Sequence, residues 1–417
     1  MIFDDIKHNF NLFMDNWSPE DDYVIYGASK DAPRLIESMD HLLKNYKLKV
    51  THIIDDDENS KILYDYPIGS VSEVYKFNQS SYVPKKFKRK NEKNDIQIIK
   101  FDDFMSDENL KNKKIIIASD YNYKFYKTYL ETKGFKEDSD FCNYKKIAAI
   151  WPFKLQNIIH LWRTDVLLTE KCTLNCTYCN MYMPHYNKQK HRDLKEIKSD
   201  IDIFFKRVDY VSVFHLIGGE PLLYPYAAEV IDHVSNNYKE KIGYFFLTTN
   251  GTITPKEAVL NSIKKNNLII HMSDYTDHIN YGRKFNQTKL DFDKYDIKYL
   301  VRNDTSWTDF GDPKIEKFKD IDETIKHFDS CSAPFRGLNN SKYYFCHLNT
   351  SAVLSEMHED NENNYIDLNN DKFNSEELLK LDLGFPKLGY VTFCKYCYGC
   401  NTKLGKKVSP KDQGLRH

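Results

Sequence analysis

The placing of the cysteines constrains this sequence more than any other feature. The chain has 417 residues and nine cysteines, an odd number that does not indicate a disulfide framework in a long chain without a secretion signal. Scattered core thiols would not gather in groups, whereas metal ligands must, because they meet around one centre. One cysteine stands alone, three fall within eight residues and five lie in the last 87: Cys142; Cys172, Cys176 and Cys179; and Cys331, Cys346, Cys394, Cys397 and Cys400.

Composition excludes several classes of function. Sixty basic and 61 acidic side chains nearly cancel, so no bulk charge is available to attract nucleic acid or an anionic membrane. The longest apolar run, residues 147–151, has five residues, against about 20 needed to span a bilayer. Asp4 and Asp5 interrupt any signal-peptide segment at its start. We therefore expect a soluble, cytoplasmic protein with no nucleic-acid partner and no membrane span, and a buried core thiol at Cys142.

The first 150 residues alternate between short apolar strands and helical stretches. We expect strands at 23–26, 50–54, 96–99 and 115–117 and a helix from Asp31 to about Tyr46. This alternation predicts a Rossmann-like parallel sheet covered by helices. The turn at 27–32 is a degraded dinucleotide-binding turn, because Ser29 replaces the glycine that lets backbone approach a pyrophosphate. A nucleotide-diphosphate ligand, or a purely structural or docking role, therefore fits better than nicotinamide binding.

Two polar stretches interrupt these patterns. The basic run 85–90 lies between two expected strands and indicates either a solvated loop or a contact to phosphate groups. The stretch 357–374 is rich in Asn and Asp and is typical of a mobile loop.

From about residue 160 the alternation starts again. A strand at 165–169 leads directly into the first cysteine group, and polar or glycine motifs follow the next strand ends, where α/β barrels place their chemistry. The expected strands are 212–217, 243–247, 268–272 and 298–301, and the expected helices are 194–208, 226–240, 255–266 and 278–293.

Cys172, Cys176 and Cys179 place three soft ligands on one tight loop. Such a set suits three corners of a cubane [4Fe–4S] cluster and leaves the fourth iron without a protein ligand. A zinc site generally takes a fourth ligand, which His185 or His191 could supply, so zinc stays open as an alternative.

Four motifs occur in the order expected of the radical SAM superfamily, which residues 160–305 therefore resemble. They are Cys172-Thr-Leu-Asn-Cys-Thr-Tyr-Cys179, Gly218-Gly-Glu-Pro221, Thr249-Asn-Gly251 and Ser273-Asp274. The resemblance implies a partial (β/α)6 TIM barrel and a [4Fe–4S] cluster whose open iron chelates S-adenosylmethionine. It also implies reductive cleavage of that molecule to a 5′-deoxyadenosyl radical that abstracts hydrogen, with electrons from an external donor such as flavodoxin or ferredoxin.

The family's cofactor contacts can be carried over onto these motifs. The glycine–glutamate segment would hold the methionine amino group, because glycine lets backbone carbonyls approach an ammonium closely. The serine and aspartate after the fourth strand would bond the ribose hydroxyls, and the tyrosine between two ligands would offer backbone to the adenine. Asn250 is a further contact, with stabilising the turn before Gly251 as its alternative role. The positions implied are Tyr178, Gly218, Gly219, Glu220, Asn250, Ser273 and Asp274.

The remaining cysteines form a second pattern. Cys331 and Cys346 flank a hairpin-like stretch, residues 338–345, with a turn expected at Asn339–Asn340. A distant Cys-x-x-Cys pair follows. This arrangement resembles the twitch domain, the shorter relative of the SPASM extension, which binds one auxiliary [4Fe–4S] cluster.

The resemblance implies that the second cluster is ligated by Cys331, Cys346, Cys394 and Cys397. Cys400 is then surplus, and it could replace a ligand, donate a hydrogen atom or be a buried thiol. A structural zinc ion held by the same four cysteines is the alternative for this site.

Catalytic groups are harder to read from the sequence. Asp309, within 307–311, could line the substrate opening, although a core or turn role fits equally well. His271 and His215 lie on expected strands, where histidines more often have structural partners than carry protons. Cys400 is the third catalytic candidate.

We expect three domains, at 1–150, 160–308 and 309–417, the last a small α+β iron–sulfur domain. The twitch-like extension and the front domain resemble enzymes of sugars and aminocyclitols, which implies oxidation or epimerisation of a sugar, nucleotide sugar or cyclitol in surface-polysaccharide or related biosynthesis. The alternative is a maturase that modifies a peptide or protein side chain, but such enzymes typically begin with a winged-helix domain. A structural or regulatory iron–sulfur protein would not need cofactor motifs at successive strand ends.

Overall fold

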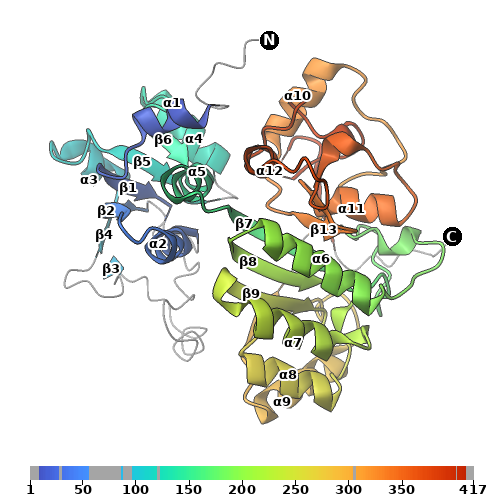
Figure 1. Cartoon of the computed structure of the whole chain (residues 1–417). Helices are drawn as coiled ribbons and strands as arrows, with labels where there is room; N and C mark the ends of the chain where they lie inside the picture. The colour runs from blue at the N-terminus through green and yellow to red at the C-terminus, as the bar shows by residue number, and fades with distance from the viewer. Residues whose placement is uncertain are drawn as a thin grey trace. The chain divides into compact units, whose positions relative to one another are not determined.

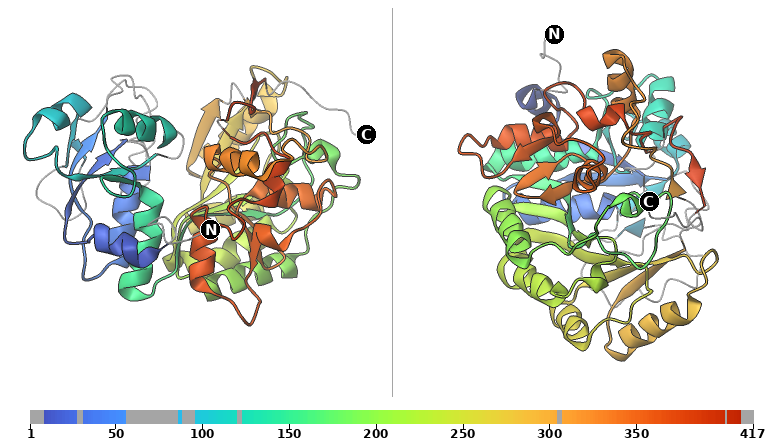
Figure 2. Two further views of the ribbon diagram at one scale, coloured as in Figure 1. Left: turned by 90° about the horizontal axis from the view of Figure 1, so that it is seen from above. Right: turned by 90° about the vertical axis from the view of Figure 1, so that its right-hand side faces the viewer.

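The computed structural model describes residues 9–27, 31–55, 86–87, 96–119, 123–303, 307–400 and 402–409. The chain forms two compact units, residues 1–160 and 161–417, which are drawn in Figure 1 and from two further directions in Figure 2. Within the described residues, no helix combines the length and the apolar character needed to cross a membrane.

The first unit is built on a six-stranded sheet, in the order β3-β4-β2-β1-β5-β6. Five strands are parallel, and β3 pairs antiparallel with β4 at the edge. The parallel sheet expected from the sequence is therefore confirmed. The strands are β1 (Asp22–Tyr26), β2 (Lys49–Ile54), β3 (Lys86–Phe87), β4 (Ile96–Ile99), β5 (Lys114–Ile117) and β6 (Phe141–Asn143).

Helices cover both faces of this sheet. Side chains of β1 alternate between the two faces and pack against helices on each of them. Tyr23 stacks on Trp17 and packs against Trp151 of α5 on one face. Tyr26 stacks on Phe101 of α3 on the other face. The helices are α1 (Phe10–Asn16), α2 (Asp31–Leu42), α3 (Phe101–Ser106), α4 (Tyr123–Thr132) and α5 (Tyr144–Gln156). Cys142 on β6 is fully buried, as expected.

The strand order changes direction between β1 and β5, which is where open α/β sheets bind ligands. Gly27 follows β1 at this point with a φ of +98°, and a Cβ there would lie 3.3 Å from the ring of Tyr126. The expected turn residue Ser29 and most of the basic run 85–90 lie outside the described residues.

The second unit is built on an eight-stranded sheet, in the order β11-β10-β9-β8-β7-β13-β14-β15. From β7 to β11 strands and helices alternate as the sequence predicts, and Figure 1 shows the helices lined up along one face of the sheet. The strands are β7 (His160–Leu167), β8 (Tyr210–Ile217), β9 (Ile242–Thr249), β10 (Ile269–Asp274) and β11 (Tyr299–Asn303); the helices are α6 (Leu194–Arg207), α7 (Ala227–Tyr238), α8 (Glu257–Asn266) and α9 (Gly282–Lys294).

Three strands from the carboxyl-terminal part extend this same sheet. β13 (Gly337–Asn339) lies parallel beside β7, and β14 (Lys342–Tyr344) and β15 (Tyr365–Asp367) continue antiparallel. The expected turn at Asn339–Asn340 is wrong by one residue, because Asn339 pairs with Lys342. The turn is Asn340–Ser341, and both have the positive φ of a tight two-residue hairpin loop.

The expected loop at 357–374 is also wrong in part, because β15 and a short 3-10 helix, Glu362–Asn364, lie within it. The Asp200 carboxylate on α6 accepts hydrogen bonds from the backbone of Asn340, at 2.8 Å, and of Ser341. The hairpin is thereby attached to α6 in the helix layer of the eight-stranded sheet. Composition alone did not reveal β15, because this strand is short and its partner β14 lies more than 20 residues away in the sequence.

The last part of the chain packs around a core that contains the carboxyl-terminal cysteines. Cys397 and Cys400 are buried in it among Phe310, Leu348 and Val391, and the other three cysteines pack against it. The surrounding elements are α10 (Ile321–Ser330), α11 (His347–Leu354), α12 (Ser375–Asp382), the 3-10 helix η6 (Thr392–Lys395) and the two-stranded pair β12 (Trp307–Thr308) and β16 (Lys407–Val408).

Candidate active site

The first cysteine group lies on the loop that follows β7. Cys176 is buried, and Cys172 and Cys179 pack against an apolar cluster that excludes water from one side of the loop. The members of this cluster are Leu167, Met181, Met183, Tyr186 and Ile217, with Leu354 of α11 packed against it. Burial raises the pKa of the Cys172 and Cys179 thiols.

Hydrogen-bond donors surround these sulfurs. Cys172 Sγ accepts from the backbone N–H of Leu174 at 3.5 Å and from Asn250 Nδ2 at 3.7 Å. Cys179 Sγ accepts from the successive N–H groups of 181–183. Donors to sulfur in an apolar setting are what thiolate ligands of an iron–sulfur cluster use, so the loop fits the group that the sequence predicts. Among the described residues, no three His, Cys, Asp or Glu side chains converge on a single metal ion.

Glu220, after β8, is fully buried, and its carboxylate is bonded within the protein. It accepts from Leu222 N at 3.0 Å, from Thr249 Oγ1 at 2.8 Å and from Asn250 N at 2.8 Å. Burial raises the pKa of this carboxyl to about 7, against the effect of its three donors. Glu220 therefore fixes the end of β9 to the end of β8. Its backbone carbonyl is also used, because it accepts from Leu223 N at 3.0 Å.

The two glycines before Glu220 are required by packing against the cysteine loop. A Cβ on Gly218 would lie 2.8 Å from Thr169 O, and one on Gly219 would lie 2.4 Å from Lys171 O. Gly219 N donates to Thr169 O and Glu220 N donates to Lys171 O, both at 2.8 Å. The sequence indicates glycine for ligand approach, and the structure adds a close contact between two backbones as a reason.

Asn250 links the end of β9 to the cysteine loop. Besides its contact to Cys172, its Nδ2 donates to Thr173 Oγ1 at 3.1 Å, and its Oδ1 accepts from Thr252 N at 3.0 Å. Both ends of the amide are thus hydrogen-bonded within the protein, and Asn250 stabilises the turn as its alternative role requires. Tyr178, the remaining predicted residue on the loop, is half-buried.

Ser273 and Asp274 end β10, beside β9 and β11, as the sequence predicts. Ser273 is buried, and its carbonyl accepts from Tyr281 Oη. Asp274 is half-buried, and its Oδ1 accepts from Thr276 N and Thr276 Oγ1 at 2.9 and 2.7 Å. The predicted cofactor positions on β8, β9 and β10 therefore share the carboxyl edge of one parallel sheet.

The carboxyl-terminal cysteines come together in the second core. Negative charge on Cys331, Cys346 and Cys397 would raise the pKa of Cys394, which burial already raises, so these four thiols are neighbours. The sulfur of Cys346, at the N-cap of α11, accepts the N–H groups of residues 348 and 349. Cys400 is buried beside them, and its N–H donates to Cys331 Sγ at 3.2 Å.

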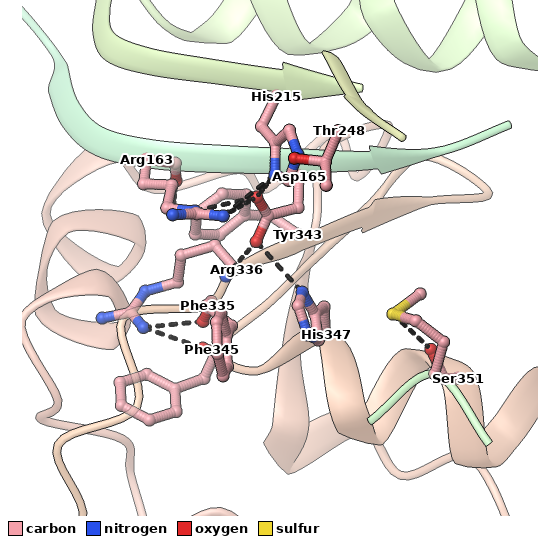
Figure 3. A network of polar contacts seen from close by, with 11 residues as sticks. Arg163, Asp165, His215, Thr248, Phe335, Arg336, Tyr343, Phe345, His347 and Ser351 are labelled. Atoms are coloured by element: carbon pink, nitrogen blue, oxygen red, sulfur yellow. Dashed lines mark hydrogen bonds and ion pairs between the residues drawn. The ribbon is translucent and has the colours of Figure 1, made fainter. Parts of the chain in front are cut away.

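The buried carboxylate of Asp165 joins β7 and β8 of the second unit to the segment before β13 and to α11 (Figure 3). Burial of Asp165 on β7 opposes its ionisation, but the Arg163 guanidinium and the hydrogen bonds from His215 and His347 hold the pKa of this carboxyl well below its usual range. Oδ1 accepts from Arg163 Nε and His215 Nδ1, each at 2.8 Å. Oδ2 accepts from Arg336 N and His347 Nδ1, each at 3.1 Å. The donors thus belong to β7, β8, the segment before β13 and α11.

The three catalytic candidates differ in their surroundings. His271 Nε2 lies 2.9 Å from the Tyr244 hydroxyl, and its ring stacks on Phe246. Asp309 Oδ1 accepts from Gly311 N at 2.8 Å and so stabilises a turn beside β12. Cys400 lies with the other cysteines of its core. The structure does not bring these three residues together in one hydrogen-bonded group within the part of the chain that it describes.

Several residues of the site were missed by the sequence analysis. Asp165 was visible as a charge inside an apolar strand, and His347 as the neighbour of Cys346. Arg336 and Tyr343, which bond Asp382 at 2.8 and 2.7 Å, gave no signal, because only the folded chain shows their partner. His215 was expected to have structural partners, and it has them: Nδ1 donates to Asp165 and Nε2 accepts from Thr248 Oγ1 at 2.8 Å.

Comparison with known proteins finds a family match in the central part of the chain. Residues 166–295 match the model of the radical SAM superfamily. The radical SAM cyclopropyl synthase TigE of Paramaledivibacter caminithermalis is 27% identical over 151 residues, which are 33% of this chain and 31% of that protein. The chain thus matches about a third of the length of this curated relative.

Solved structures are also similar over more than half of the chain. One is anSMEcpe with bound AdoMet and Cp18Cys peptide, with a TM-score of 0.37 and 15% identity over 61% of this chain and 93% of that one. Another is BtrN in complex with AdoMet and 2-DOIA, with a TM-score of 0.37 and 14% identity over 61% of this chain and 97% of that one.

The first prediction concerns the contact between the glycine segment and the cysteine loop. We expect Gly219→Ala to lower the free energy of unfolding by about 1–3 kcal/mol, because the added methyl would displace the Lys171 backbone. Gly282→Ala is the control, since a Cβ at this first residue of α9 meets nothing closer than 4.0 Å. Urea unfolding followed by circular dichroism measures both, and equal stability of the two variants would contradict the packing argument.

The second prediction concerns pH. Burial lowers the pKa of His215 to about 4, with Arg163 adding to the effect and Asp165 opposing it. An unfolded histidine has a pKa near 6.5, so the stabilising contribution is complete above about pH 6.5 and is lost as the pH falls toward 4, by about 3 kcal/mol. Thermal melting at pH 7 and pH 5 should therefore show a smaller difference in His215→Gln than in the wild type.

His233→Gln is the control for this measurement, because His233 lies on the surface of α7 and bonds Asp202. It should keep the pH dependence of the wild type. The assignment of His215 as a neutral buried histidine is wrong if both variants change with pH as the wild type does.

Proposed function

We propose that the chain is a radical SAM enzyme that cleaves S-adenosylmethionine reductively and abstracts hydrogen from a carbohydrate-type substrate, in line with the match of residues 166–295 to the radical SAM superfamily model. Such a substrate is a sugar, a nucleotide sugar or a cyclitol, and the outcome is oxidation or epimerisation. The observation that carries the chemistry is the group of three thiols on the loop after β7, with hydrogen-bond donors on its sulfurs and the predicted cofactor positions at the next three strand ends.

Cys172, Cys176 and Cys179 are the residues that would hold the first [4Fe–4S] cluster. When bound, the cluster supplies the electron that cleaves S-adenosylmethionine, taken from an external donor such as flavodoxin or ferredoxin. The chain's own part is to exclude water and to hold the loop: Leu167, Met183 and the neighbouring apolar side chains cover it.

The segment Gly218–Glu220 would bind the methionine amino group through its backbone, because the Glu220 carboxylate is used to join β8 to β9. Ser273 and Asp274 would meet the ribose hydroxyls, and Tyr178 the adenine. Asn250 would act through its hydrogen bond to Cys172, since its amide is already bonded to the protein at both ends.

We propose that Cys331, Cys346, Cys394 and Cys397 hold a second, auxiliary [4Fe–4S] cluster. Support comes from the core in which the five carboxyl-terminal cysteines gather and from the position of Cys346 at the N-terminus of α11, where backbone N–H groups meet its sulfur. Such a cluster could accept the electron of a substrate radical, so that oxidation is redox-neutral overall. Cys400 would then donate a backbone hydrogen bond to the ligand Cys331.

The carbohydrate class is supported by the topology of the first unit. The strand order of its parallel sheet changes direction between β1 and β5. The carboxyl ends of the strands at such a switch point commonly bind nucleotides. A maturase acting on peptides or proteins remains the alternative, and the substrate experiment below decides between the two.

The third prediction tests the metal centres. Anaerobically reconstituted protein should bind about eight irons per chain, from two clusters of four. Cys394→Ala should reduce this to about four, and Cys176→Ala should abolish formation of 5′-deoxyadenosine from S-adenosylmethionine with dithionite. Cys142→Ala is the matched control, because this thiol is buried in the first unit and should affect neither measurement beyond stability. Unchanged 5′-deoxyadenosine in Cys176→Ala would refute the chemistry.

The fourth prediction tests the substrate class. Nucleotide sugars should raise the melting temperature of the full chain, because a ligand that binds only the folded state stabilises it. The matching free sugars serve as controls for the nucleotide part. If no sugar, nucleotide sugar or cyclitol shifts the melting temperature and a peptide does, the carbohydrate proposal fails while the iron measurements stay valid.

A further inference from the structure

Tyr182 connects the two cysteine groups: its backbone is part of the first loop and its side chain is part of the second core. In sequence it lies three residues after Cys179, and its backbone N–H donates to Cys179 O at 2.9 Å. Its φ of +54° is unusual for a residue other than glycine and turns the chain out of the first loop. Its side chain lies in the other core, with Cys397 and Cys400, and the residue is 4% exposed. No other residue of the segment 172–186 is part of that core.

The hydroxyl of Tyr182 has no hydrogen-bond partner among the residues that the structure describes, although it is buried from solvent. Nearby buried tyrosines do have partners: Tyr186 Oη donates to Ser351 O at 3.2 Å, and Tyr224 Oη donates to Arg192 O at 3.1 Å. An unpaired buried hydroxyl is costly, so native structures rarely keep one without a reason. The hydroxyl therefore points to a group that the protein itself does not supply.

The surroundings of this hydroxyl indicate the chemistry of that group. Burial raises the pKa of Tyr182, and charges on Cys397 and Cys346 would raise it further, so both thiols are near. Asp309 and Asp312 act in the same direction, but their Oδ1 atoms accept from Gly311 N and Lys314 N in their own turns. A phenol hydroxyl beside several thiols faces a sulfur-rich acceptor.

We propose that the Tyr182 hydroxyl donates a hydrogen bond to a sulfur of the iron–sulfur group held by the carboxyl-terminal cysteines. This inference rests on the proposed second cluster. Hydrogen bonds to cluster sulfurs stabilise the reduced, more negative form and so raise the reduction potential. Tyr182 is then a positioning residue: it tunes the second cluster and, through Cys179, attaches it to the loop of the first.

The first measurement compares Tyr182→Phe with Tyr186→Phe in protein purified without iron. Both variants remove one buried hydroxyl from the same segment. Tyr182→Phe should melt at the temperature of the wild type or above it, because no protein hydrogen bond is lost. Tyr186→Phe should melt at a lower temperature, because it loses the bond to Ser351. A similar decrease in both variants would overturn the inference, since it would show that Tyr182 has a partner in the chain.

The second measurement is a redox titration of reconstituted protein, followed by electron paramagnetic resonance. In Tyr182→Phe the potential of the second cluster should become more negative, while that of the first stays unchanged. In Tyr186→Phe the second cluster should keep the potential of the wild type. Eight irons with an unshifted potential in Tyr182→Phe would overturn this inference alone, whereas four irons in the wild type would overturn the second cluster itself.

Discussion

The buried carboxylate of Asp165 is the interaction on which the second unit depends. An ionised carboxylate away from water is tolerated only when its oxygens are fully bonded, and losing a partner is costly. Asp165 therefore fixes His215 on β8, the backbone before β13 and His347 on α11 in one arrangement. α11 begins just after Cys346, and its last residue, Leu354, packs against the same apolar cluster as Cys172 and Cys179. One carboxylate on β7 thus connects the strands of the first cysteine group to the helix that follows Cys346.

Glu220 does a similar task at the edge of the sheet by different means. Asp165 is surrounded by cationic and N–H donors, which keep it ionised, whereas Glu220 faces only neutral donors and its pKa rises to about 7. Both carboxylates join neighbouring strands, yet only Asp165 has a cationic side chain, Arg163, beside it. The two carboxylates thus join strands with different electrostatics: Asp165 is held ionised, whereas the pKa of Glu220 lies near neutral pH.

The sequence predicted the strands and helices well because hydrophobic periodicity is a local property. The spacing of the carboxyl-terminal cysteines also indicated a common centre, and the structure places all five in or against one core, whereas the choice of metal ligands among them stays a prediction. The sequence could not predict the hydrogen-bond partners of Asp165 or the core in which Tyr182 is buried, because these depend on elements that meet only in the folded chain. The turn at Asn340–Ser341 was placed one residue early, since Asn339 and Asn340 are equally good turn residues and only strand pairing decides between them.

The glycines before Glu220 show why a motif can have two causes at once. A side chain at Gly219 would strike the backbone of Lys171, which directly precedes the first cysteine. The same lack of a side chain leaves backbone free to meet a ligand. Because the β8 segment and the cysteine loop bond each other through Gly219 and Glu220, a shift in either would move the other. Packing and the proposed ligand binding are therefore compatible explanations: the contact that excludes a side chain also places the backbone of Gly219 against the loop that carries the thiols.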